Sequence, residues 1–392
     1  TMHVAGEGWA ADVPLDATEI GSKMVDVYIN ELVGMTKEIS ERIMTERVSA
    51  RRAELSAERA KEFEEKRFVY GEHELRYKER VFGEAPPGGH SLWISMHGGG
   101  GAPPEVNDQQ WENQIGLYEP AEGIYIAPRA PGNTWDLWHT PQVDPLFQRL
   151  IESFVAARNV NPNRVYLMGY SAGGDGVYQL APRMADRFAA AAMMAGHPNE
   201  TKPDGLRNLP FAIFMGGKDA AYDRNKIAQR FGDQLAALRE ADPEGYTCLL
   251  KIYPEHAHWM NGDDKEALPW MAEKTRNPWP KRIVWLQDNV THERFYWLQV
   301  APEDARGGRR IVALVDGQKI HIESPETNAV TLLLSDELLD LDQPIEVFAN
   351  GALVFRGKAE RRPEVYEAFF ETRFDPAAFP MAKLALRWLP KK

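Results

Sequence analysis

The first 67 residues carry a pattern of apolar positions that predicts helix. No proline occurs between Asp16 and Arg67, and charged residues of both signs separate the apolar ones. Spacings of three to five residues place apolar side chains on one face of a helix. The stripe consists of Ile20, Met24, Val27, Leu32, Met35, Ile39 and Ile43. We therefore expect residues 1–67 to form an N-terminal helical extension packed on the main domain, with a dimerisation or partner helix as the alternative.

Between residues 68 and 280 the pattern changes to short apolar runs that alternate with helical stretches. Two runs, 68–70 and 75–78, are joined through Gly71 and predict a pair of strands. Further strands are expected at 92–96, 124–127, 165–168, 190–194, 211–215 and 249–253, and helices at 145–158, 174–184 and 225–239. Buried strands that alternate with helices indicate an α/β domain with a mostly parallel sheet covered on both faces.

Residues 281–392 show strand-like runs in close succession. The expected strands are 294–300, 310–315, 319–323, 330–334, 345–349 and 353–357. Asn350-Gly351 lies between the last two and is a strong hairpin signal. We expect a small all-β, sandwich-like C-terminal domain. Its aromatic residues are interpreted as core, with sugar stacking as the alternative; they are Trp285, Phe295, Tyr296 and Trp297.

Composition narrows the class of protein. Hydrophobic residues make up 43% of the 392 positions, enough for a substantial core, and the formal net charge of -12 argues against nucleic-acid or anionic-membrane partners. No apolar run reaches the roughly 18 residues of a membrane helix. The single cysteine, Cys248, is expected in a buried strand and cannot form an intramolecular disulfide. We expect a soluble protein, secreted or periplasmic if a leader preceded Thr1; compartment and oligomeric state stay open.

The strongest chemical signal is the run Gly169-Tyr170-Ser171-Ala172-Gly173, which follows an expected strand and opens an expected helix. Small residues two before and two after a serine let the backbone turn sharply, so that the side chain stands exposed at the end of the strand. The start of the helix offers free N–H groups and the positive end of its dipole. Ser171 is therefore the expected nucleophile. The alternative is a glycine-rich loop with an incidental serine.

A second glycine loop, His97-Gly98-Gly99-Gly100-Gly101, follows the expected strand 92–96. Together with the serine motif it resembles the α/β-hydrolase superfamily, in which HGGG-type loops of lipases and esterases supply the oxyanion hole. The resemblance implies backbone donors at Gly99, Gly100 and Ala172. A phosphate-binding loop is disfavoured, because no Gly-Lys-Ser/Thr ending is present. We expect His97 to brace the loop and group it with the substrate-binding candidates.

The same resemblance implies an acid and then a base later in the chain. Asp219 follows the strand 211–215 in Gly216-Gly217-Lys218-Asp219, with Asp223 as the fallback. His258 follows Tyr253-Pro254 and is favoured over His256 as the base. The histidines with Glu255, Asp263 and Asp264 lack the spacing of a metal site, so neither a metal nor another cofactor is expected.

Residues 90–275 resemble the branch of polyhydroxyalkanoate-depolymerase-like, feruloyl-esterase-like and phospholipase/carboxylesterase-like enzymes. Asn161-Pro162-Asn163-Arg164 and Ala172-Gly173-Gly174 carry this resemblance. It implies hydrolysis of a small-molecule or polymer carboxylic ester through an acyl-enzyme intermediate. The alternatives are a peptidase of the prolyl-oligopeptidase type and a non-catalytic binding protein on a relict hydrolase core.

Two tryptophans are candidates for the substrate site. Trp135 and Trp138 follow the expected strand 124–127 and should lie at the same edge of the sheet as Ser171. They are equally consistent with walls of the site and with packing under the loop. The connection from Gly196 to Leu209 is expected to be only a loop, which predicts an open cleft.

Overall fold

The computed structural model describes residues 2–6, 9–13 and 35–388. Four members of the expected apolar stripe therefore lie outside the described residues: Ile20, Met24, Val27 and Leu32. Ahead of the stretch expected to be helical, β1 (Met2–Gly6) and β2 (Trp9–Val13) form an antiparallel pair that the sequence did not predict.

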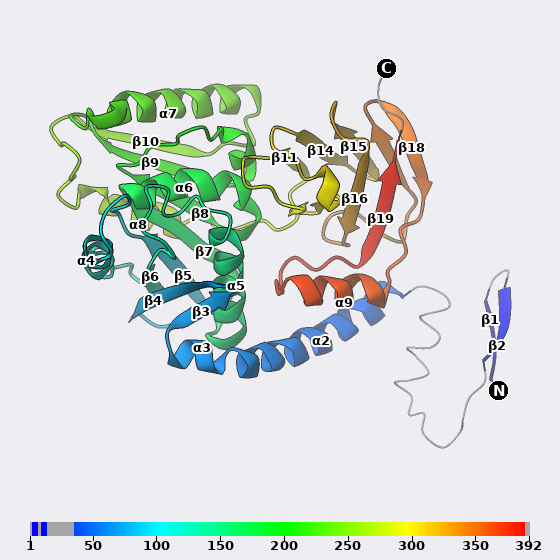
Figure 1. Ribbon diagram of the computed structural model, residues 1–392. Coiled ribbons are helices and arrows are strands. Elements are labelled where there is room, and N and C mark those ends of the chain that lie inside the picture. The colour runs from blue at the N-terminus through cyan, green and yellow to red at the C-terminus, as the bar shows by residue number, and fades with distance from the viewer. Residues whose placement is uncertain (1, 7–8, 14–34, 389–392) are drawn as a thin grey trace.

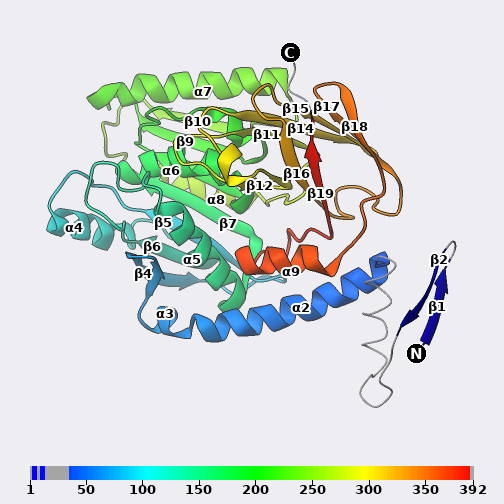
Figure 2. The ribbon, with the colours of Figure 1, turned by 45° about the vertical axis from the view of Figure 1, so that its right-hand side comes forward.

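The expected N-terminal helix is present further along, as α2 (Lys37–Glu58), followed by the short α3 (Ala60–Glu64). Thr36 caps α2 by accepting a hydrogen bond from the Ile39 N–H at 3.4 Å. α2 runs along α5 (Val143–Ala157) and reaches α9 (Pro363–Thr372), where Arg47 binds Glu367 at 2.6 Å (Figures 1 and 2). The helix therefore lies against both the α/β core and the C-terminal part of the chain.

An eight-stranded sheet forms the centre of the molecule, in the order β10-β9-β8-β7-β5-β6-β4-β3. Its strands are β3 (Arg67–Tyr70), β4 (His73–Phe82), β5 (His90–Met96), β6 (Gly123–Pro128), β7 (Val160–Tyr170), β8 (Ala190–Met194), β9 (Phe211–Gly216) and β10 (Cys248–Tyr253). The six strands from β5 to β10 are parallel, whereas β3 and β4 pair antiparallel. The expected mixed, mostly parallel sheet is confirmed.

Both faces of the sheet are buried at its central strands. Along β5, Leu92 and Ile94 belong to one hydrophobic cluster and Trp93 to another, as strand alternation requires. The covering helices are α4 (Pro104–Gln114), α5, α6 (Ala172–Arg183), α7 (Arg224–Ala241) and α8 (Ala267–Ala272). Short 3-10 turns occur at Ala185–Arg187, Pro203–Asn208, Ala221–Asp223, Asp263–Glu266 and Pro302–Asp304. None of the described helices has the length and apolar character needed to cross a bilayer.

The C-terminal part contains two further sheets, with strand orders β11-β14-β15-β17-β18 and β12-β13-β16-β19. The strands are β11 (Arg282–Leu286), β12 (Arg294–Phe295), β13 (Leu298–Gln299), β14 (Arg310–Asp316), β15 (Lys319–Glu323), β16 (Ala329–Leu334), β17 (Ile345–Ala349), β18 (Ala352–Gly357) and β19 (Ala382–Arg387). The hairpin at Asn350-Gly351 is confirmed, with both residues at positive φ.

Two expectations for this part are wrong. Residues 294–300 do not form one strand, because Tyr296 adopts a φ of 52° and splits the run into β12 and β13. The region is also not all-β, since α9 packs Phe369 and Phe370 into the core. The domain boundaries at 67/68 and 280/281 stay predictions.

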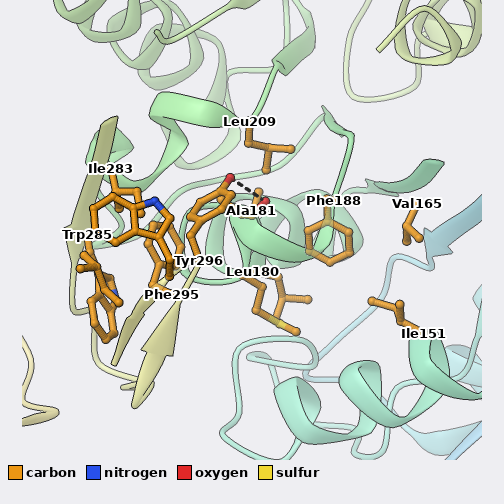
Figure 3. Close-up of a cluster of buried hydrophobic side chains, with 14 of the residues drawn as sticks. Ile151, Val165, Leu180, Ala181, Phe188, Leu209, Ile283, Trp285, Phe295 and Tyr296 are labelled. Atoms are coloured by element: carbon orange, nitrogen blue, oxygen red, sulfur yellow. Dashed lines mark hydrogen bonds between the residues drawn. The ribbon is translucent and has the colours of Figure 1, made fainter. Parts of the chain in front are cut away.

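A continuous apolar core joins the C-terminal sheets to the α/β core (Figure 3). Trp285 and Phe295 stack with ring centroids 5.8 Å apart, and the Tyr296 hydroxyl donates to the Ala185 carbonyl at 3.1 Å. The aromatic residues Trp285, Phe295, Tyr296 and Trp297 are all buried. Their interpretation as core residues is confirmed.

A buried ion-pair cluster lies at the same junction. Asp375 accepts hydrogen bonds from Arg276 Nη1 and Nη2 at 2.6 and 2.8 Å and from Arg187 at 3.3 Å, and Arg373 lies 3.7 Å away. Burial opposes ionisation of Asp375, but the three arginines outweigh it and hold the pKa of the carboxyl well below its ordinary value.

Candidate active site

Ser171 lies on a strained turn between β7 and α6. Its φ of 58° and ψ of -119° are sparsely populated for a residue with a side chain. A Cβ on Gly169 would lie 2.3 Å from the Gly173 carbonyl oxygen, and one on Gly173 would lie 2.1 Å from that of Met96. The glycines of the motif are therefore required by close backbone contacts, and they allow the serine to project from the carboxyl end of the sheet.

Ser171, His258 and Asp219 form one hydrogen-bonded chain. His258 Nε2 lies 2.9 Å from Ser171 Oγ, and His258 Nδ1 lies 2.7 Å from Asp219 Oδ2. Since a carboxylate only accepts, Nδ1 carries the proton and Nε2 can accept the one from the serine. Asp219 is 3% exposed, so its charge acts on the imidazole with little screening by water.

The loop after β10 is held in place by contacts on either side of His258. The Tyr170 hydroxyl donates to the His258 carbonyl at 2.8 Å and accepts from the Met260 N–H at 2.9 Å. A Cβ on Gly216 would lie 1.9 Å from the Ala257 carbonyl oxygen, so this loop lies directly on the end of β9.

The alternative acid and base lie elsewhere. His256 Nε2 contacts Asp263 at 2.7 Å, and Asp223 pairs with Lys226 at 3.0 Å. Neither residue takes part in the hydrogen-bonded chain of Ser171. Among the residues that the structure describes, no group of three or more His, Cys, Asp or Glu side chains is arranged to hold a metal ion.

The glycine loop after β5 does not offer both of its expected donors. Gly99 and Gly100 have φ values of +107° and +85°, which favour glycine. The Gly100 N–H already donates to Asn107 Oδ1 at 2.8 Å, so its expected role in an oxyanion hole does not fit this geometry. Asn107 is fully buried on α4, and no local sequence signal indicated that it would take this hydrogen bond. The Ala172 N–H stands in the first turn of α6, where no intrahelical acceptor is available.

His97 and Trp138 are buried supports of that loop, both with 0% exposure. His97 Nδ1 donates to the Gly98 carbonyl at 2.6 Å, and Nε2 accepts from the Ala130 N–H at 3.1 Å. Burial lowers the pKa of His97 to about 4, which keeps the imidazole neutral for these two bonds. Trp138 donates to the His97 carbonyl at 3.0 Å. Direct contact of either side chain with substrate therefore does not fit, whereas loop bracing by His97 does.

Trp135 has a different environment, with 64% of its surface exposed. It lies beside the glycine loop, where a Cβ on Gly101 would come within 3.6 Å of its Cβ. Trp135 does not line the cavity beside the nucleophile. Its contact with substrate stays a prediction for the rim of the site.

A cavity of about 570 Å³ opens beside Ser171. One of its walls is α4, which was absent from the helices expected from sequence because its residues are mostly polar and weakly periodic. The lining residues are Gly98, Gly99, Val106, Gln110, Asn113, Gln114, Leu117, Tyr170, Ser171, His258 and Trp259. The connection from Gly196 to Leu209 contains only the 3-10 turn Pro203–Asn208.

A known family model matches the part of the chain that carries the candidate active site. Residues 126–290, which include Ser171, Asp219 and His258, match the family model described as the Dienelactone hydrolase family. This partial match agrees with the resemblance to the α/β-hydrolase superfamily that the sequence motifs indicated.

The matched relatives cover parts of the chain. "Putative esterase NocK" of Nocardia uniformis subsp. tsuyamanensis is 32% identical over 150 residues, which span 34% of this chain and 42% of that protein. Among solved structures, a thermostable esterase covers 54% of this chain and 62% of its own at 20% identity and a TM-score of 0.41. LpqC, a poly(3-hydroxybutyrate) depolymerase from Bordetella parapertussis, covers 52% of this chain and 86% of its own at 16% identity and a TM-score of 0.40.

Proposed function

We propose that this protein is a serine hydrolase that cleaves carboxylic esters, with Ser171 as nucleophile, His258 as general base and acid, and Asp219 as the group that orients the imidazole. The observation that carries the proposal is the hydrogen-bonded chain from Asp219 through His258 to Ser171 at the wall of an accessible cavity. The partial match to a protein described as an esterase supports the ester class.

The first half of the reaction forms an acyl-enzyme. His258 Nε2 takes the Ser171 hydroxyl proton as Oγ attacks the ester carbonyl carbon, and Asp219 stabilises the imidazolium. The tetrahedral oxyanion is bound by the N–H groups of Ala172 and Gly99, the donors that remain once Gly100 is committed to Asn107. His258 then gives its proton to the departing alcohol, which leaves the acyl group on the serine.

The second half repeats these steps with water. His258 removes a proton from water as its oxygen attacks the acyl carbon, and returns that proton to Ser171 Oγ when the acid product leaves. No step requires a cofactor.

The test replaces Ser171 with alanine and measures hydrolysis of p-nitrophenyl butanoate together with labelling by a fluorophosphonate probe. We expect loss of labelling and a fall in hydrolysis of at least about 10³-fold, because triad members act as one unit. Ser49→Ala, an exposed serine on α2, is the matched control and should keep both. Hydrolysis that survives in Ser171→Ala would sink the mechanism, and preferential cleavage of peptide p-nitroanilides would favour the peptidase alternative.

A further inference from the structure

The side chain of Gln110 lies beside the nucleophile with its carboxamide uncommitted. A Cβ on Gly98 would be 3.1 Å from Ser171 Cβ and 3.7 Å from Gln110 Oε1, and one on Gly99 would be 3.6 Å from Gln110 Cγ. Gln110 therefore packs against the loop that borders the nucleophile, and it lines the cavity together with Ser171. Within the part of the chain that is described, its carboxamide has no hydrogen-bond partner, so its N–H groups and its oxygen are free to bind a molecule in the cavity.

The cavity around Gln110 lacks permanent charge. None of the described residues that line it is Lys, Arg, Asp or Glu. Two acidic residues on the same helix are paired away from it: Asp108 binds Arg129 at 2.7 Å, and Glu112 binds Lys78. An anion that entered this space would meet no counter-charge, in a protein whose net charge is already -12.

An unpaired carboxylate loses part of its hydration when it enters such a cavity, and it gains no ion pair in return. A neutral group with an ether, carbonyl or hydroxyl oxygen loses far less, and it gains a hydrogen bond from the Gln110 amide. The cavity therefore favours neutral esters over anionic ones on physical grounds.

We propose that Gln110 contacts the substrate directly and that its cavity selects esters whose enclosed part is uncharged. The inference rests on the proposed ester hydrolysis and adds to it a substrate class and a residue that sets specificity.

The experiment compares kcat/KM for two matched pairs of esters. In one pair the acyl group ends either in a methyl ester or in a carboxylate: methyl p-nitrophenyl glutarate and mono-p-nitrophenyl glutarate. In the other pair the phenol carries either a methyl ester or a carboxylate: 4-(methoxycarbonyl)phenyl butanoate and 4-carboxyphenyl butanoate. We expect the neutral ester to be preferred at least tenfold in the pair whose variable group enters the cavity.

Three variants then assign the selectivity to Gln110. Gln110→Lys places a cation in the cavity and should reduce the preference in that same pair at least fivefold by raising hydrolysis of the anionic ester. Gln110→Leu should lower kcat/KM for the neutral ester about threefold to tenfold. Gln234→Lys makes the same charge change at an exposed position on α7, away from the residues that line the cavity, and should leave the ratio within twofold.

The inference is overturned if neither pair shows the preference while hydrolysis by Ser171 is intact. It is equally overturned if Gln234→Lys shifts the ratio as much as Gln110→Lys, because the effect would then come from the charge of the whole protein. If the wild type cleaves none of the four esters and takes no fluorophosphonate label, the proposed function fails first and the inference falls with it.

Discussion

Replacing Asp375 with asparagine removes a buried carboxylate that lies within 4 Å of three buried arginines, Arg187, Arg276 and Arg373. Asp375 is 2% exposed, and Arg276 and Arg187 are 5% and 3% exposed. Asparagine has almost the same volume, so the change leaves no cavity and isolates the electrostatic effect. Its amide can still accept at one oxygen, but it places an NH₂ group against a guanidinium.

The magnitude follows from the difference between a paired and an unpaired buried charge. Breaking a buried ion pair by removing one partner costs about 3–5 kcal/mol, because the remaining charge stays buried without compensation. Here the Arg276 guanidinium loses a two-bond contact and Arg187 loses a weaker one, while Arg373 keeps Asp186 at 2.6 Å. We therefore expect Asp375→Asn to lower the free energy of unfolding by about 3 kcal/mol or more.

Urea denaturation at pH 7, followed by tryptophan fluorescence, measures this loss. The exposed Asp316 on β14 supplies the control, since Asp316→Asn should change the free energy of unfolding by less than about 0.5 kcal/mol. The pKa of Asp375 is lower in the folded state than in the unfolded state, where it is about 3.9. The stability that its charge contributes is therefore complete above the unfolded-state pKa, and it is lost only as the pH falls through the lower folded-state pKa. The difference between variant and wild type should thus stay constant from pH 5 to pH 8. A loss below about 1 kcal/mol at pH 7 would refute the reasoning.

Two further predictions concern the site. The pKa of His97 is about 4 in the folded protein and ordinarily 6.5, so the unfolded chain binds more protons between these pH values and stability falls on acidification. His97→Gln lacks this group, so its free energy of unfolding should depend less on pH. Between pH 7 and pH 5 it should fall by about 2 kcal/mol less than that of the wild type. Equal falls in the two proteins would contradict this. Gly216→Ala forces the Ala257 carbonyl and the loop that carries His258 to move, so ester hydrolysis should fall about 100-fold. A Cβ on Gly132 would meet only Thr134 Oγ1, at an ordinary contact distance of 3.9 Å, so Gly132→Ala should keep full activity. Undiminished hydrolysis by Gly216→Ala would show that the loop tolerates the shift.

Much of the α/β part could be predicted from sequence, because each buried strand is a continuous apolar run bounded by turn residues. The weakly patterned elements could not. The helix α4 carries mostly polar residues, and only its position against Gly98 and Gly99 makes Gln110 a wall of the site. The run 294–300 looks like one strand, yet Tyr296 turns out of it to place its ring in the junction core.

The sequence by itself determined the position and setting of Ser171. The strand, the flanking glycines and the helix start are requirements of a few consecutive residues, so local sequence carries them in full. The sequence favoured His258 over His256 only through a family resemblance, and the tertiary contacts are what bring His258 to that serine. His256 and His258 are both within reach along the chain, and the Tyr170 hydroxyl bond to the His258 carbonyl, which joins segments 88 residues apart, sets the orientation of the loop. The commitment of the Gly100 N–H to Asn107 and the burial of Trp138 beneath His97 were decided in the same way. Such contacts depend on three-dimensional packing, which no spacing of residue types along the chain specifies.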